Sequence, residues 1–264
     1  MPRARTAEHH GVTPALRRGL VAYVTAGDPD LRASADVLRG VARGGADVIE
    51  VGVPFSDPIA DGPSIQRAAE RALAAGGGLA ATLDLIARVR GEIDVPIVLF
   101  TYVNPVLRMG QEAFLSRAAA AGVNGLLLLD LPIEESADLQ AALGRHRIDQ
   151  IFLISPTTTD ARLRQAAALG RGFLYAISRT GVTGARATVA ESAGPLVQRI
   201  RAVTTLPIAL GFGISRPEHV RDVHAFADAA VVGSALVDAI ATAAARGEDA
   251  GRAAEQFVRW VKGG

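Results

Sequence analysis

Residues 47–66 read DVIEVGVPFSDPIADGPSIQ, an apolar run that is followed by a polar loop and the start of a helical pattern. The run 47–54 is rich in Val and Ile and does not alternate with polar residues. Such a run is typical of a strand that is buried on both faces, as in a parallel sheet. The stretch is therefore one strand–loop–helix unit, in which helical spacing continues over residues 64–75.

The same unit recurs along the whole chain. Seven further apolar runs of strand length are separated by stretches with helical spacing, and several of these stretches begin at potential caps, namely Asp28, Asp160 and Ser215. The other strands are expected at 19–27, 96–102, 125–132, 150–156, 172–179, 207–213 and 229–235. Helices are expected at 31–43, 64–75, 79–89, 114–121, 134–143, 161–169, 195–203 and 217–226, with two more within 235–261.

Eight such strands allow a closed (β/α)8 barrel or an open, doubly wound sheet. Eight equivalent units without an intervening linker favour the barrel. We therefore predict the α/β class, with residues 1–264 forming a single (β/α)8 TIM barrel that carries extra helices. Residues 1–18 are expected to form a poorly ordered or atypical N-terminal extension.

Composition excludes several classes of function. The formal net charge is +1, and no basic patch is interleaved with aromatic residues, so nucleic-acid binding has little support. The absence of cysteine excludes disulfides and thiolate chemistry and fits a reducing cytoplasm. The polar first nine residues argue against a signal peptide, and no apolar run is long enough to span a membrane. We expect a cytoplasmic protein.

In a barrel of this kind, reactive groups lie at the C-terminal ends of the strands and in the loops that follow. Glu50 lies within an apolar run, where burial raises the pKa of a carboxyl group, and it can be either catalytic or a paired structural carboxylate. Asp57 and Asp61 in the next loop can be catalytic, or can serve helix capping and turn formation. Asp130, at the end of the fourth run, raises the same question.

Three glycine-rich segments follow the last three strands. SRTGVTGA, GFGIS and GSA each combine glycine with a hydroxyl residue at a strand end. Glycine allows the backbone to approach a ligand closely, and a helix N-terminus favours an anion. Because barrels often bind phosphate after strands seven and eight, we favour a phosphate ester over simple turn formation. Arg179 can be a phosphate clamp or a solvated loop residue.

No metal site is expected. His146, His219 and His224 fall in helical regions, and the last two are five residues apart. That spacing differs from the four-residue spacing that places two ligands on one helix face. His9 and His10 lie in the N-terminal extension.

The loop PFSDPIADGPSIQ strongly resembles the tryptophan synthase alpha chain family. Matching segments follow in the family's order and cover nearly the whole chain. They are LVAYVTAGDPD, ADVIEVGVPFSDP, TYVNP, DLPIEES, SRTGVTGA, GFGIS and VVGSALV.

The resemblance implies a retro-aldol cleavage of indole-3-glycerol phosphate to indole and glyceraldehyde 3-phosphate, without a cofactor. Glu50 matches the family's acid/base carboxylate, and its apolar strand would supply the raised pKa that a carboxylic acid needs near neutrality. Asp61 matches the second catalytic carboxylate, which accepts from the indole N–H and stabilises positive charge on the ring.

The resemblance also implies the substrate-binding residues. Tyr23, Phe100 and Phe212 correspond to the indole pocket, Tyr175 assists the carboxylates, and Thr183 contacts the aspartate when a loop closes. The positions that match phosphate-binding backbone are Gly184, Gly213, Gly233 and Ser234.

The family's partner is a pyridoxal-phosphate beta chain in an alpha2-beta2 heterotetramer, which receives indole through a tunnel. Pro54, Asp57, Asn104 and Pro132 match positions at that interface. The chain departs from the family up to Arg18, where the usual amphipathic first helix is missing from the sequence pattern.

Three alternatives remain at this point. A stand-alone indole-3-glycerol phosphate lyase would use the same residues without a beta chain. A non-catalytic, allosteric alpha-like subunit would not need both carboxylates. A phosphate-sugar isomerase barrel would explain the glycine-rich loops but not PFSDPIADGPSIQ.

Overall fold

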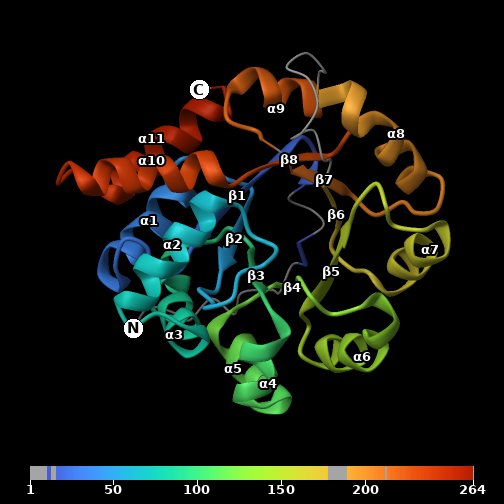
Figure 1. Cartoon of the computed structure of the whole chain (residues 1–264), viewed down its shortest axis with the longest axis horizontal. Helices are drawn as coiled ribbons and strands as arrows, with labels where there is room; N and C mark the ends of the chain where they lie inside the picture. Colours follow the sequence, from blue (N-terminus) through green and yellow to red (C-terminus); the bar gives the residue numbers. More distant parts are fainter. Residues whose placement is uncertain (1–10, 13–15, 178–188, 212, 264) are drawn as a thin grey trace, which may run out of the picture.

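Eight parallel strands close into a barrel in sequence order, with β8 hydrogen-bonded to β1 (Figure 1). The computed structural model describes residues 11–12, 16–177, 189–211 and 213–263. The strands are β1 (Gly19–Thr25), β2 (Val48–Gly52), β3 (Ile97–Thr101), β4 (Gly125–Leu128), β5 (Asp149–Ile154), β6 (Leu174–Ile177), β7 (Ile208–Gly211) and β8 (Ala229–Val232).

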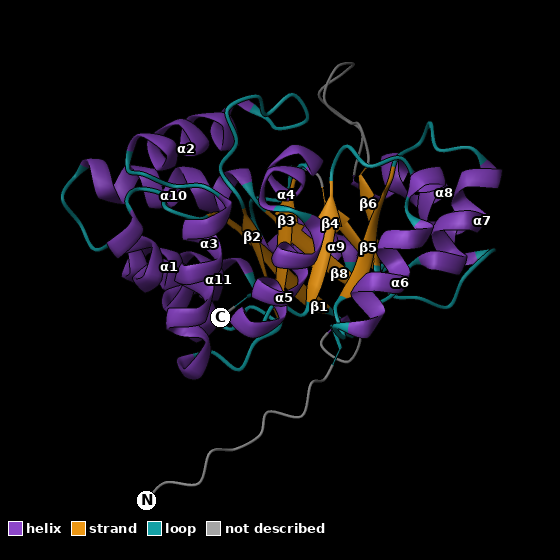
Figure 2. Ribbon diagram, turned by 90° about the horizontal axis from the view of Figure 1, so that it is seen from below, coloured by secondary structure: helices purple, strands orange, loops and turns teal. Residues whose placement is uncertain are grey.

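Helices surround the barrel (Figures 1 and 2). They are α1 (Leu31–Arg43), α2 (Pro63–Ala74), α3 (Leu79–Val89), α4 (Val103–Met109), α5 (Gln111–Ala121), α6 (Ala137–Arg145), α7 (Asp160–Leu169), α8 (Val189–Arg201), α9 (Pro217–Val223), α10 (Ser234–Ala245) and α11 (Ala250–Val261). Short 3-10 turns occupy Arg90–Glu92 and Ile133–Glu135. No single helix in the described ranges is long and apolar enough to cross a membrane, and only α2 taken with 79–92, bent by 89°, passes that test jointly.

The predicted barrel is confirmed, and each of the eight predicted strands coincides with an observed one. The prediction for α8 was wrong at its start, because Pro195 lies inside the helix and not at its first turn. The short helix α4 was not predicted. The helix predicted from residue 134 begins only at Ala137, after the 3-10 turn.

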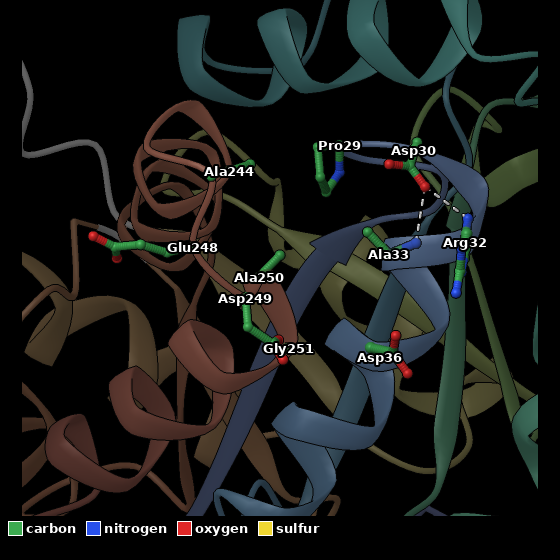
Figure 3. A pocket seen from close by; sticks show the side chains of 11 residues that line it. Pro29, Asp30, Arg32, Ala33, Asp36, Ala244, Glu248, Asp249, Ala250 and Gly251 are labelled. Atoms are coloured by element: carbon green, nitrogen blue, oxygen red, sulfur yellow. Dashed lines mark hydrogen bonds between the residues drawn. The ribbon is translucent and has the colours of Figure 1, made fainter.

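The interpretations of the helix caps were also wrong. Asp30, and not Asp28, caps α1, and its Oδ1 accepts from the N–H groups of Arg32 and Ala33 at 2.9 Å (Figure 3). Asp28 is buried and accepts two bonds from the Arg71 guanidinium, at 2.7 and 2.9 Å. The caps of α7 and α9 are Thr159 and Arg216, in place of the predicted Asp160 and Ser215.

Two apolar layers hold the fold together. Outward-facing strand residues pack against the helices, and alternate residues fill the barrel, because successive strand side chains point to opposite faces. The interior layer includes Val21, Val48, Val98, Leu127, Ile151, Phe173, Ala209, Ala229 and Val231. This filling leaves the space for a ligand at the C-terminal ends of the strands.

The opposite end of the barrel is closed by Val12 and Leu16, which are buried against the interior layer. The N–H of Val12 donates to Asp149 Oδ2 at 3.0 Å. The prediction of a poorly ordered or atypical extension over residues 1–18 concerns mostly residues outside the described ones.

Polar side chains before three strands fix the register at that same end. Each of these side chains accepts a hydrogen bond from a backbone N–H at the first or second residue of the preceding strand. The acceptor–donor pairs are Asp47 with Leu20 at 2.7 Å, Asn124 with Ile97 at 2.9 Å and Asp228 with Ile208 at 2.7 Å. Buried N–H groups at this end are thereby satisfied.

Candidate active site

Glu50 lies in the middle of β2 and points into the barrel, since Val48 two residues earlier belongs to the interior layer. Its side chain is completely buried. Within the described part of the chain, neither carboxylate oxygen has a hydrogen-bond partner. A buried carboxylate without a partner is costly when it is charged, so the neutral acid is favoured.

Burial, together with the nearby negative charge of Asp61, raises the pKa of Glu50 to about 8. The side chain therefore holds its proton near neutral pH. A carboxylic acid with a pKa close to the working pH is suited to general acid–base chemistry.

Asp61 lies on the loop after β2, and it is partly buried. The hydroxyl of Tyr102 donates to its Oδ2 at 3.0 Å. Partial burial raises the pKa of Asp61, and the hydrogen bond from Tyr102 opposes that rise. The amide of Gln66 donates to the backbone oxygen of Asp61 at 2.8 Å, which ties the loop to the first turn of α2.

Tyr23 and Phe100 form an aromatic wall beside Glu50. Their rings meet edge to face, with centroids 5.3 Å apart. Tyr23 stands opposite Glu50 in the register of β1 and β2. Burial and the charges of Asp61 and Glu50 raise the pKa of the Tyr23 phenol, so it stays neutral. This arrangement offers an apolar ring-binding surface next to the acid.

Tyr175 on β6 approaches the same carboxyl group. Burial and the charge of Glu50 raise the pKa of its phenol. A Cβ on Gly211 of β7 would lie 2.4 Å from the Tyr175 hydroxyl oxygen, so only glycine leaves room for this ring. Phe212, predicted for the same pocket, lies outside the described residues.

Three predicted phosphate contacts lie just after β7 and β8. Gly213 is exposed and has a φ of +59°, a backbone conformation that favours glycine. Gly233 caps α10, which begins with the exposed Ser234. A helix N-terminus of this kind favours an anion. Thr183, Gly184 and Arg179 lie outside the described residues.

Sequence reasoning missed Tyr102 and left the role of Asp130 open between catalysis and structure. Tyr102 follows β3 in the TYVNP segment, and its contact with Asp61 spans 41 residues of sequence. Asp130 Oδ1 accepts from the N–H of Val103 at 2.7 Å, which gives this side chain a structural role between two strand ends. Among the described residues, no group of three or more His, Cys, Asp or Glu side chains is placed to hold a metal ion.

Comparison with known proteins agrees with this geometry. The family model of the tryptophan synthase alpha chain matches residues 12–263. The chain belongs to this family. The alpha chain of Solibacter usitatus is 51% identical over 84% of this chain and 83% of its own length. That of Gloeobacter violaceus is 49% identical over 92% of this chain and 87% of its own length.

Solved alpha-chain structures share the fold. The tryptophan synthase alpha subunit of Legionella pneumophila superposes with a TM-score of 0.87 at 34% identity, covering 95% of this chain and 96% of that one. The structure of the Pyrococcus furiosus tryptophan synthase α2β2 complex gives a TM-score of 0.86 at 37% identity, covering 94% and 98% of the two chains.

The four positions predicted for the alpha–beta interface follow three neighbouring strands. Pro54 and Asp57 lie on the loop after β2, Asn104 lies in α4 after β3, and Pro132 lies on the loop after β4. Asp57, Asn104 and Pro132 are exposed, whereas Pro54 is buried. A groove of about 510 Å³ opens beside them, lined by Pro54, Phe55, Ser56, Leu73, Gly78, Leu79, Pro105, Arg108 and Met109. A second pocket, of about 440 Å³, lies between the start of α1 and the connection from α10 to α11, where no strand contributes (Figure 3).

Proposed function

We propose that this chain is a lyase that cleaves indole-3-glycerol phosphate to indole and glyceraldehyde 3-phosphate, as the alpha half of tryptophan synthase in tryptophan biosynthesis. The observation that carries the proposal is Glu50, a fully buried acid with a pKa of about 8 beside the carboxylate of Asp61. Two carboxyl groups with different surroundings can take different roles in one reaction.

Glu50 protonates carbon 3 of the indole ring, which turns the ring into an electron acceptor. The hydroxyl of the adjacent side-chain carbon then loses its proton to the Glu50 carboxylate, and the carbon–oxygen double bond forms. The electrons of the breaking carbon–carbon bond return to the ring, so indole and the aldehyde separate. Asp61 accepts from the ring N–H and stabilises the positive charge that develops there.

Binding is divided between two regions of the rim. Tyr23 and Phe100 hold the indole ring with Phe212, and Tyr175 orients Glu50. The backbone at Gly213, Gly233 and Ser234 holds the phosphate with Gly184, and the start of α10 adds a favourable dipole. Thr183 contacts Asp61 when the loop after β6 closes. No cofactor takes part in this scheme.

The partner is a tryptophan synthase beta chain, docked on the face that carries Pro54, Asp57, Asn104 and Pro132. Two exposed apolar side chains on the same segments support the docking face: Ile59 on the loop after β2 is 87% accessible, and Leu107 on α4 is 66% accessible. Exposed apolar side chains beside an apolar groove mark protein interfaces. We place the assembly in the cytoplasm, with which a cysteine-free sequence is compatible.

The test is the release of indole from indole-3-glycerol phosphate by the purified chain, with and without a beta chain. We expect cleavage by the chain alone and a faster rate in the complex. No indole under either condition would contradict the proposed reaction. A high rate that the beta chain leaves unchanged would instead favour the stand-alone lyase.

A further inference from the structure

Tyr102 connects the loop of Asp61 to the end of β3. Its side chain is almost fully buried. The hydroxyl donates to Asp61 Oδ2 at 3.0 Å and accepts from the N–H of Ala60 at 3.1 Å. One phenol therefore holds both the carboxylate and the backbone of the loop that carries it.

The phenol is itself held in place from several sides. Its ring packs against Phe55, with centroids 5.0 Å apart. The next N–H, that of Val103, donates to Asp130 at 2.7 Å, and the N–H of Leu129 donates to Thr101 O at 3.0 Å. The backbone around Tyr102 is thus fixed to the ends of both β3 and β4. Its phenol can therefore hold the Asp61 carboxylate in a defined position.

The hydrogen bond occupies one oxygen of the Asp61 carboxylate and leaves the other for a ligand. Among the described residues, only Tyr102 donates to this carboxylate, and it does so at Oδ2. A hydrogen bond to a charged acceptor also stabilises the charged form. It opposes the effect of partial burial, which raises the pKa of Asp61.

We propose that Tyr102 is a positioning residue for the cleavage reaction: its hydroxyl holds Asp61 ionised and oriented, with Oδ1 free to accept the indole N–H. This inference rests on the proposed function, in which Asp61 contacts the substrate ring. Tyr102 acts through Asp61 and does not itself contact the reacting atoms.

The test uses Tyr102→Phe in the complex with the beta chain and follows indole release across pH. The variant keeps the ring and its packing on Phe55. We expect kcat to fall about 10- to 100-fold, the range for a hydrogen bond to a charged group, while KM changes less than about threefold because the phosphate contacts remain. Since the lost hydrogen bond lowered the pKa of Asp61, the acid limb of the kcat/KM profile should move to higher pH.

The matched control is Ser64→Ala, which removes a hydroxyl that donates to a different carboxylate, Asp238, at 2.8 Å from the first turn of α2. It should keep the kcat and the pH profile of the unmodified chain. A double-mutant cycle with Asp61→Asn completes the test. If Tyr102 acts through Asp61, its removal should have little further effect on turnover in that background.

Three results would overturn the inference while leaving the proposed reaction intact. They are normal kinetics and an unshifted profile in Tyr102→Phe, equal losses with and without the Asp61 carboxylate, and a Tyr102→Phe chain that fails to fold. A failure of the unmodified chain to release indole is a separate result, and it would refute the proposed function itself.

Discussion

The phenol of Tyr23 on β1 occupies the space that a side chain at Gly52 on β2 would need. A Cβ on Gly52 would lie 2.1 Å from the Tyr23 hydroxyl oxygen and 2.5 Å from the ring carbon that carries it. Tyr175 stands in the same relation to Gly211 across β6 and β7. Both tyrosines thus lean toward the next strand, and glycine at each position makes room for a ring beside Glu50.

Gly52→Ala should therefore damage both stability and function. We expect the free energy of unfolding to fall by about 1–3 kcal/mol, the usual cost of overpacking, and indole release to fall because Tyr23 must move into the ring-binding space. Urea denaturation and steady-state turnover measure the two effects. In Gly144→Ala, where a Cβ meets nothing within 4 Å, stability should be equal or slightly higher. Equal stability of the two variants would show that the Tyr23 ring can move away from a Cβ at residue 52 without a loss of folding free energy.

Glu50→Gln should nearly abolish indole release while the chain still binds the substrate. The amide keeps the size of the side chain but cannot donate a proton to the ring and then take one from the hydroxyl. Turnover and equilibrium binding, measured on the same preparation, separate the two effects. A variant with normal turnover would remove Glu50 from the mechanism.

The same substitution should change how stability depends on pH. A carboxyl whose pKa is about 8 in the folded chain, against an ordinary value of 4.5, binds a proton more tightly when folded. Its contribution to stability is complete below pH 4.5 and is lost as pH rises through 8, at up to about 1.4 kcal/mol per pH unit.

Glu50→Gln removes this contribution. As pH rises from about 4.5 to about 8, the unfolding free energy of the unmodified chain should therefore fall relative to that of the variant. Urea denaturation of both chains at the two ends of this window gives the difference. Parallel stability curves for the two chains would show that Glu50 does not titrate in this window.

Asp61→Asn should lose most of the turnover, while the backbone positions proposed to bind phosphate keep their affinity for it. Asparagine keeps the shape of the side chain, but it cannot balance the positive charge on the protonated ring. We expect a large fall in kcat and a small change in the affinity for inorganic phosphate as a probe of the rim. Unchanged kinetics would exclude Asp61 from the reaction, and a loss of phosphate affinity would indicate a wider disturbance of the rim.

The barrel could be predicted from the sequence because strands buried on both faces leave unbroken apolar runs, and β2 with its Glu50 is an example. Local patterns failed where a distant partner decides the role of a residue. Asp28 has the sequence context of a helix cap, but Arg71, 43 residues later, engages its carboxylate. Asp61 stood out in its loop, whereas Tyr102, which holds it, has the sequence context of an ordinary strand-end aromatic.

The proposed docking face offers a test with a control in the same chain. Ile59 and Leu107 are 87% and 66% accessible and lie on the loop after β2 and on α4, whereas Trp260 is 48% accessible and lies on α11. If a beta chain covers the first two, Ile59→Ser and Leu107→Ser should each weaken its binding about tenfold, because each removes a large apolar side chain from the interface. Trp260→Ser should leave the affinity unchanged, since α11 carries none of the predicted interface positions Pro54, Asp57, Asn104 and Pro132. Titration calorimetry with the beta chain measures all three affinities. Equal weakening by the three variants, or by none, would contradict this docking face, and weakening by Trp260→Ser alone would move it to α11.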